Sequence, residues 1–333
     1  MMAIWLGQSR GRAARRTAEL LLPIGVSTLI VFFGIYEQRF WSPINLINIL
    51  RNSSYLSVIS LGQMLVLVIG GFDLSVGAVV ALASVIAAST MREMASAAPA
   101  APGFAVSVGI LSALACGAVV GAVNGVAVAL MKVHALMVTL GTMSLVTGIA
   151  LYLTRGVPVY GMPEWFVLEF GRRMQMLGIP VVVYVAGVII AVQWLLLTRT
   201  PMGRHLYALG SHAEAARLSG VNANVGIIGA HVLCSVLAAV TGVLFTARIG
   251  SGEATLGSSL TLESIAAAVI GGVSLRGGVG KVWQVILGAI LLTVLSNGTN
   301  LMRIDSKAQT AVVGAALILA VALDRFNAGE RKR

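Results

Sequence analysis

Residues able to perform chemistry are few and scattered in this sequence. Its histidines have no metal-ligand spacing, and no HExxH or CxxC motif occurs. The chain also has no Walker A motif and no glycine fingerprint for a nucleotide. We therefore predict no catalytic site, metal or cofactor. Any energy that this protein uses must enter through another subunit or an ion gradient.

Asp73 is the main charged residue inside an apolar stretch, and it follows a Gly-Gly pair. Its carboxylate could cap the N-terminus of the next helix or serve as a proton relay. A second stretch, VIGGVSLRGG (269–278), resembles VIGGFDLSVG (68–77) and places Ser274 at a matching position. We favour the cap because it explains both sites. A second echo, Asn-Gly at 124 and at 297, has a different offset, so no internal repeat is established.

Uncharged polar residues also occur within the apolar stretches. They are Gln63, Asn124, Thr139, Thr142 and Asn297. Hydrogen bonding between helices explains most such residues. A neutral polyhydroxylated solute would need the same amides and hydroxyls along its path. Together with Asp73, these residues are our candidates for a translocation path.

The longest polar interval between apolar segments covers Arg199 to Asn224 and is mainly basic. It predicts a short pair of helices in a loop over 198–224. Within it, Glu214-Ala215-Ala216, three residues and Gly220 form an EAAxxxG pattern, and Arg204, Glu214 and Arg217 supply charged anchors at its rim. A small-residue face followed by a glycine turn could bind in a groove of a soluble partner protein. The alternative is a solvated helical hairpin without a partner.

Composition identifies the solvent that surrounds these residues. Hydrophobic residues make up 58% of the chain and charged residues only 11%, with a mean hydropathy of +0.93. Soluble domains carry roughly 25% charged residues, so most of this surface must face lipid. Apolar segments of about 20 residues recur, as spanning helices require. We predict an all-α polytopic membrane protein with about ten spans, at 18–36, 54–71, 74–91, 103–131, 135–154, 179–197, 225–248, 262–273, 282–296 and 308–323.

The basic residues indicate orientation rather than binding of nucleic acid. The net charge is +11, but Arg and Lys gather before the first span and after the last. This positive-inside pattern places both termini, and the loop over 198–224, in the cytoplasm. The predicted organisation is a basic segment (1–17), a single transmembrane domain (18–323) and a basic tail (324–333). An irregular stretch over 37–53 predicts an interfacial elbow helix.

Small residues inside the spans predict close helix packing. Gly117, Gly121 and Gly125 repeat every four residues and so lie on one helix face. Without side chains there, another helix can approach closely. Cys116 and Cys234 both lie in apolar segments and predict no disulfide.

Several stretches, in order along most of the chain, resemble the permease subunits of bacterial ABC importers for ribose, xylose, galactose and related sugars. They are GGFDLSVGA (70–78), VTLGTMSLVTGIALYLTRG (138–156), MGRHLYALGSHAEAARLSGVN (202–222), ESIAAAVIGGVSLRGGVG (263–280) and GAILLTVLSNGTNLM (288–302). The sequence departs from the usual family pattern at Ser211-His212, Glu263 and Gln284.

The resemblance implies a homodimeric permease in the bacterial inner membrane. A cytoplasmic ATPase would bind the EAA-type loop, and a periplasmic sugar-binding protein would deliver the solute. Two alternatives stay open: the related permease for branched-chain amino acids, and a self-contained secondary transporter or channel.

Overall fold

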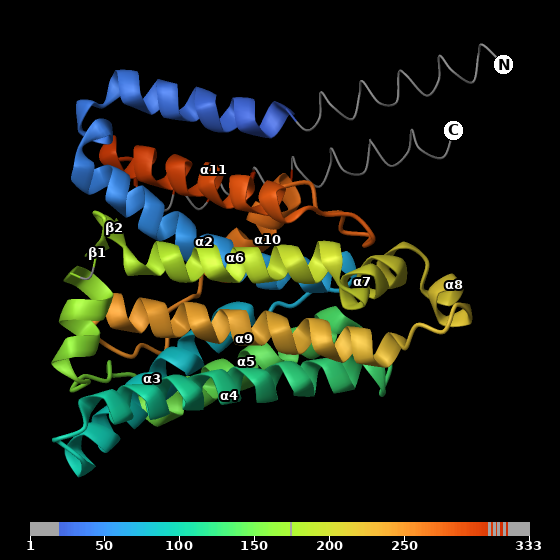
Figure 1. Cartoon of the computed structure of the whole chain (residues 1–333), viewed down its shortest axis with the longest axis horizontal. Coiled ribbons are helices and arrows are strands. Elements are labelled where there is room, and N and C mark those ends of the chain that lie inside the picture. Colours follow the sequence, from blue (N-terminus) through green and yellow to red (C-terminus); the bar gives the residue numbers. More distant parts are fainter. Residues whose placement is uncertain are drawn as a thin grey trace.

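The computed structural model describes residues 20–173, 175–305 and, beyond them, 308, 311, 314, 315 and 318. Apart from one small hairpin, the regular elements in this part of the chain are helices (Figure 1). After a first helix, Leu20–Tyr36, the elements are η1 (Gln38–Trp41), α2 (Pro43–Val68), α3 (Val76–Ala97), α4 (Pro102–Ala129), α5 (Ala135–Thr154), η2 (Trp165–Arg173), β1 (Gln175–Met176), β2 (Ile179–Pro180), α6 (Val181–Arg199), α7 (Pro201–Ser211), α8 (Ala213–Leu218), α9 (Ala223–Ile249), α10 (Leu260–Ile270) and α11 (Val282–Leu301).

The protein is a polytopic helical membrane protein, as predicted. In the described part, α3, α4, α5, α6, α9 and α11 are long and apolar enough to cross a membrane. Leu20–Tyr36 and α10 are shorter apolar helices, and α2 is long but polar in its first half. The predicted span 308–323 lies mostly outside the described residues, and the segments 1–17 and 324–333 lie wholly outside them.

The expected elbow helix over 37–53 is wrong, because α2 is one continuous helix from Pro43. Ser42 caps it by accepting a hydrogen bond from the Asn45 N–H, and Pro43 occupies the first turn, where no N–H is needed. The Asn45 side chain donates to the Phe40 carbonyl. Local hydrogen bonds thus accommodate the polar residues that suggested a break.

The all-α prediction also omits a small β element. Gln175 pairs with Pro180 and Met176 with Ile179 in an antiparallel hairpin just before α6. The hairpin lies at one end of the bundle, and α7 and α8 lie at the opposite end (Figure 1).

Both similar VIGG stretches end a helix with the same turn. Gly70 has φ 80°, and the Gly71 N–H bonds to the Val66 carbonyl at the end of α2. At the end of α10, Gly272 has φ 82° and the Val273 N–H bonds to the Ala268 carbonyl. Each is a Schellman-type end that needs glycine at the left-handed position. The second turn comes one residue later in the aligned stretch.

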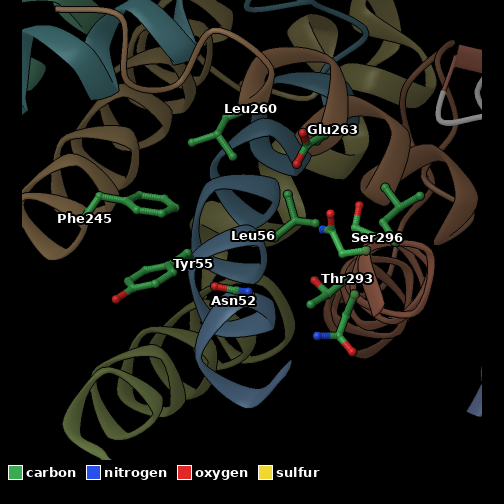
Figure 2. Close-up of a pocket in the computed structure, with 11 residues that line it drawn as sticks. Asn52, Tyr55, Leu56, Phe245, Leu260, Glu263, Thr293 and Ser296 are labelled. Atoms are coloured by element: carbon green, nitrogen blue, oxygen red, sulfur yellow. The ribbon is translucent and has the colours of Figure 1, made fainter. Parts of the chain in front are cut away.

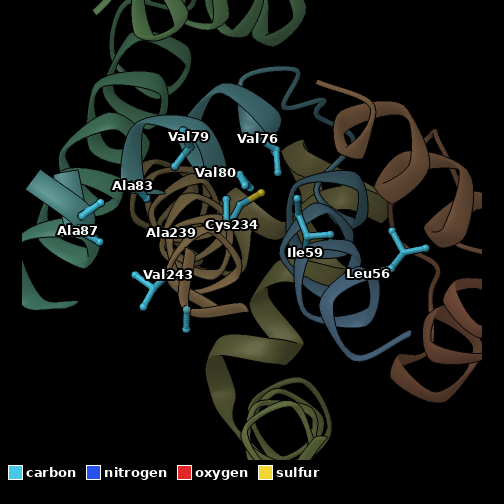
Figure 3. Packing of buried hydrophobic residues seen from close by; sticks show 14 of the residues in the cluster. Leu56, Ile59, Val76, Val79, Val80, Ala83, Ala87, Cys234, Ala239 and Val243 are labelled. Atoms are coloured by element: carbon cyan, nitrogen blue, oxygen red, sulfur yellow. The ribbon is translucent and has the colours of Figure 1, made fainter. Parts of the chain in front are cut away.

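Helix α9 lies at the centre of the bundle and packs against α4, α3 and α2, and α2 in turn packs against α11, α10 and α6. The main buried cluster joins α2, α3 and α9 through residues such as Ile59, Val80, Cys234 and Val243 (Figure 3). Both cysteines are free.

The glycine face of α4 lies directly against α9. A Cβ added at Gly121 would lie 2.5 Å from the His231 carbonyl oxygen, and one at Gly125 would lie 2.7 Å from the Ile228 Cα. At Gly117 an added Cβ would meet the Ala239 side chain at 2.7 Å. Glycine at these positions therefore permits the close backbone approach of α4 and α9.

The helix ends alternate between the two ends of the bundle. Val68, at the end of α2, accepts a hydrogen bond from Gly278 beside α7, and Gly125 near the end of α4 meets the first turns of α9. At the opposite end, Val159 after α5 forms a β-bridge with Gly252 after α9. We call the end that carries α7 and α8 the coupling end.

The starts of α3 and α10 meet inside the bundle. The Gly77 N–H donates to Thr261 Oγ1 at 3.0 Å, and a Cβ at Gly77 would collide with the Gly257 carbonyl. The irregular segment 250–259 leads into α10, and Gly252 within it packs on Ser84 and Ala88 of α3. Irregular backbone within an apolar bundle is stable only when protein surrounds it.

Candidate functional site

The loop over 198–224 forms two short helices, α7 and α8, at the coupling end (Figure 1). Thr200 caps α7 by accepting from the Gly203 N–H, and Pro201 begins that helix. The His212 ring accepts from the Ala215 N–H at the start of α8. These capping residues explain why the segment after α6 forms the helices α7 and α8 immediately after it leaves the bundle.

The EAAxxxG residues form a protruding knob on α8. Glu214, Ala215 and Arg217 are exposed, whereas Ala216 is buried. Gly220 has φ 83° and nothing within 4 Å of its Cβ position, so it serves the turn after α8. Leu218 next to it is 79% exposed. The knob therefore presents both apolar and charged atoms to a partner.

Glu214 and Arg217 form an exposed ion pair on this knob, with 2.8 Å between Glu214 Oε1 and Arg217 Nη2. The hydrogen bond from Arg217 lowers the pKa of Glu214, and the same contact raises the pKa of Arg217. Both groups are therefore charged at neutral pH. Arg204 is also exposed, but on α7.

Four of the predicted path residues gather where α2 connects to α3. Asp73 Oδ1 accepts hydrogen bonds from both the backbone N–H and the hydroxyl of Ser75. Asn124 Nδ2 donates to Ser75 Oγ at 2.9 Å, and Thr142 Oγ1 donates to Asn124 Oδ1 at 2.6 Å. Thr139 Oγ1 lies 3.4 Å from the Phe72 carbonyl oxygen. This buried network ties α3, α4 and α5 to the irregular segment before α3.

Asp73 is not the N-cap residue of α3, which is Ser75, but its carboxylate satisfies the Ser75 N–H two residues on. Its other oxygen lies 3.4 Å from His231 Nδ1, and both side chains are fully buried. Ser274 forms a similar turn by accepting from the Arg276 N–H at 3.3 Å. No helix begins there, since α11 starts at Val282, so the predicted cap at Ser274 is wrong.

Gln63 lies apart from this network, in the middle of α2. It is fully buried, and neither its amide nitrogen nor its amide oxygen has a partner among the described residues. A buried amide without partners is costly. Such a group can bind a water or a solute hydroxyl.

Asn297, the last predicted path residue, pairs with Asn45 across α2 and α11. Each amide nitrogen donates to the other amide oxygen, at 2.7 Å and 3.0 Å. Among the predicted path residues, Asn297 alone also lines a cavity between α2, α9, α10 and α11.

A cavity of about 200 Å³ opens between α2, α9, α10 and α11 (Figure 2). Its lining combines amides, hydroxyls and one carboxylate with aromatic and leucine side chains. The lining residues are Asn52, Tyr55, Leu56, Phe245, Leu260, Glu263, Leu292, Thr293, Ser296, Asn297 and Asn300. One water needs only about 10–15 Å³ on this measure, so the cavity is large enough for a bigger ligand. We call it the polar cavity.

Packing and hydrogen bonds hold the aromatic wall of the polar cavity in place. The Tyr55 and Phe245 rings stack with their centroids 4.2 Å apart. Arg248 Nη1 donates to Asn52 Oδ1 at 2.6 Å, and its guanidinium lies over the Tyr55 ring. Arg248 thus positions two lining side chains.

The polar cavity lies in the half of the bundle away from the coupling end. Asn52 and Tyr55 precede Val68 by several turns of α2, and Phe245 lies near the far end of α9. On α11 the lining residues occupy the second half of the helix. The cavity and the knob are therefore separated by much of the bundle's length.

Sequence reasoning missed most of the cavity lining, although a signal was present. Thr293, Ser296, Asn297 and Asn300 follow the i, i+3, i+4, i+7 spacing that puts residues on one face of a helix. A polar stripe at this spacing in an apolar segment indicates a face that is turned away from lipid.

The profile of the family described as branched-chain amino acid transport system / permease component matches residues 45–321. The chain is 37% identical to the ribose import permease protein RbsC of Escherichia coli K12 over 308 aligned residues. The alignment covers 90% of this chain and 92% of the relative. It is 36% identical to the galactose/methyl galactoside import permease protein MglC of the same organism, over 91% and 93% of the two chains. Its identity to the D-allose transport system permease protein AlsC is 33%, over 90% of each chain. No solved structure matches it significantly.

Proposed function

The chain belongs to the family described as branched-chain amino acid transport system / permease component, and on that premise we propose that it is the membrane-spanning permease subunit of an ATP-driven sugar importer. Its solute is a monosaccharide or related polyol. The observation that carries this proposal is the similarity, over about nine tenths of both chains, to import permeases named for ribose, allose and galactose.

The chain is not an enzyme; in ABC transporters of this kind the ATPase is a separate subunit. The sequence accordingly contains no Walker A motif. We propose that this cytoplasmic ATPase binds the knob on α8. A periplasmic sugar-binding protein would deliver the solute to the opposite end of the bundle.

The polar cavity supports a sugar over a branched-chain amino acid. A zwitterion would need a cation for its carboxylate. The lining residues include none, and the Arg248 guanidinium behind the wall already donates to Asn52 and covers the Tyr55 ring. Amides and hydroxyls can exchange hydrogen bonds with sugar hydroxyls, and Tyr55 and Phe245 offer apolar ring surface. Burying a carboxylate without a partner costs several kcal/mol, so this lining favours a neutral solute over an amino acid.

We place the solute path from the polar cavity towards the coupling end. Gln63 supports this course, because its buried amide has no partner among the described residues. In this proposal the network of Asp73, Asn124, Thr139 and Thr142 is mainly structural, because these side chains already have partners.

We propose that the chain crosses the membrane ten times. Residues 250–270, the irregular segment together with α10, return from the far end of the bundle towards the coupling end. Twenty residues are about what one crossing requires. With 308–323 as the tenth, both termini would be cytoplasmic in the inner membrane.

Reconstitution into lipid vesicles tests the function. The chain is inserted together with its partner ATPase and its periplasmic binding protein, and uptake of labelled ribose, allose, galactose and leucine is measured. We expect ATP-dependent uptake of a sugar that stops when the ATPase is omitted. Uptake by the chain alone, driven by a sodium or proton gradient, would overturn the proposal. ATP-dependent uptake of leucine but of no sugar would identify the solute as an amino acid and would overturn the assignment of a sugar.

A further inference from the structure

Helix α7 touches the bundle through backbone atoms at Gly210. A Cβ added at Gly210 would collide with the Val68 carbonyl oxygen and would lie 2.5 Å from the Gly278 nitrogen. Real Cβ atoms do not approach backbone so closely, so this position requires glycine. It brings α7 into direct contact with the end of α2 and the segment between α10 and α11.

The two segments that meet Gly210 are also bonded to each other. The Gly278 N–H donates to the Val68 carbonyl at 2.7 Å, which satisfies an acceptor that the end of α2 would otherwise leave free. A Cβ at Gly277 would lie 2.8 Å from the Gly70 nitrogen and 2.9 Å from the Gly210 oxygen. Gly277 and Gly278 have φ 87° and 73°, which favour glycine.

A third contact lies one turn earlier on α7. The Tyr207 hydroxyl donates to the Gly280 carbonyl at 2.7 Å, just before α11 begins. We call these contacts of Tyr207 and Gly210 with Val68 and residues 277–280 the glycine joint.

The helices held by the glycine joint also build the polar cavity. Every lining residue of the cavity lies on α2, α10 or α11, except Phe245 on α9. The joint contacts the coupling end of α2 and the connection between α10 and α11. When α7 moves, it therefore moves α2 and the connection between α10 and α11, and these are helices that line the cavity.

We propose that the glycine joint transmits movement of the ATPase-bound helices α7 and α8 to the polar cavity, with Gly210 and Tyr207 as positioning residues. The inference rests on the proposed function. Contacts between backbone atoms cannot absorb a displacement by changing a side-chain rotamer, so the three segments move together. Packed interfaces of this kind switch between discrete arrangements rather than deforming continuously.

Two variants test the joint. Gly210→Ala forces α7 away from Val68 and Gly278, and Tyr207→Phe removes only the hydrogen bond to Gly280. Gly187→Ala is the matched control, because Gly187 also lies within a helix, α6, and has nothing within 4 Å of its Cβ position. Each is reconstituted with the ATPase and binding protein, and both sugar uptake and ATP hydrolysis are measured.

We expect Gly210→Ala to retain the ATPase in co-purification and to hydrolyse ATP. Its sugar imported per ATP should fall by about 5-fold or more, the lower end of typical coupling between linked sites. Tyr207→Phe should lower the same ratio less, and Gly187→Ala should leave it unchanged.

Unchanged ratios in both joint variants would overturn the proposal. If Gly210→Ala does not insert, Tyr207→Phe decides, because it keeps the ring and its packing. A failure of the proposed function is distinguishable, since the wild-type chain would then show no ATP-dependent sugar uptake at all.

Discussion

Asp73 accepts hydrogen bonds from Ser75 and approaches His231, and all of these groups are buried. A buried carboxylate in a membrane protein raises the possibility of a proton pathway. Its two hydrogen bonds from Ser75 are those of a local turn just before α3. We therefore assign it a structural role.

Asp73→Asn should preserve transport. The asparagine oxygen still accepts from Ser75, so ATP-dependent uptake should remain close to wild type and should not change when the proton gradient is collapsed. Asp73→Ala removes the acceptor and should destabilise the protein by about 1–3 kcal/mol. Wild-type uptake that needs the proton gradient, together with an inactive Asp73→Asn variant, would instead identify a proton relay.

The Asn45–Asn297 pair offers a second residue-level prediction. Removing either side chain leaves the other amide unpaired between α2 and α11, so Asn45→Ala and Asn297→Ala should each lower the free energy of unfolding by about 1 kcal/mol. The double variant should cost less than the sum of the two single changes, because each single change already leaves the other amide without its partner. The further cost of Asn45→Ala is the Phe40 carbonyl, which loses its donor. Strictly additive losses in denaturation measurements would show that the two amides are not coupled.

Among the elements, α4 and α9 depend on glycine for their contact. The backbone of α9 occupies the space that side chains at Gly117, Gly121 and Gly125 would need. In lipid, such close packing takes the place of a hydrophobic driving force between helices. The small-residue spacing therefore identified a helix-packing face.

Gly121→Ala should separate α4 from α9, because its methyl group would lie 2.5 Å from the His231 carbonyl oxygen. Overpacking of this kind costs about 1–3 kcal/mol, and thermal unfolding in detergent measures it. Gly103→Ala on the same helix has open space around it and is the control. Equal melting temperatures for the two variants would contradict the packing role.

The knob on α8 carries the other element-level prediction. Glu214→Lys replaces the ion pair with a like-charge contact beside Arg217, so the ATPase should dissociate and uptake should fall. Glu169→Lys is the matched control, because Glu169 is partly exposed and pairs with Arg173, but lies in η2 beside the hairpin, away from the coupling end. Co-purification of the ATPase with each variant is the measurement. Equal retention by both would rule out docking at Glu214.

At the scale of the whole molecule, the polar cavity and the knob lie in different halves of the bundle. The glycine joint, α2 and α11 connect them. The family resemblance implies a homodimer, and we propose that the transporter contains two copies of this chain, so that each of two knobs would engage one ATPase.

Two differently tagged versions of the chain should therefore co-purify when they are expressed together, and native mass spectrometry should find two copies per complex. A complex with a single copy, or with a second and different permease, would contradict the homodimer. The solute measurements would remain valid in either case.

The sequence alone determined the membrane class, most helices, the family and the helical loop that protrudes from the bundle. These properties follow from local signals: hydropathy over about 20 residues, proline and hydroxyl caps such as Ser42-Pro43 and Thr200-Pro201, and glycine at helix ends. The Ser42 cap starts α2 at Pro43, and the Asn45 side chain bonds to the Phe40 carbonyl, so the polar residues of this stretch begin a helix that continues to Val68.

Only the tertiary structure decided which polar residues meet. The polar cavity combines Asn52 and Tyr55 with Glu263 and Thr293, and the glycine joint brings Val68 to Gly210 and Gly278. Lipid and the bundle interior are similarly apolar, so hydropathy does not mark which face of a span turns inward. That choice depends on packing between segments far apart in the chain, and it brings the polar side chains together in one cavity.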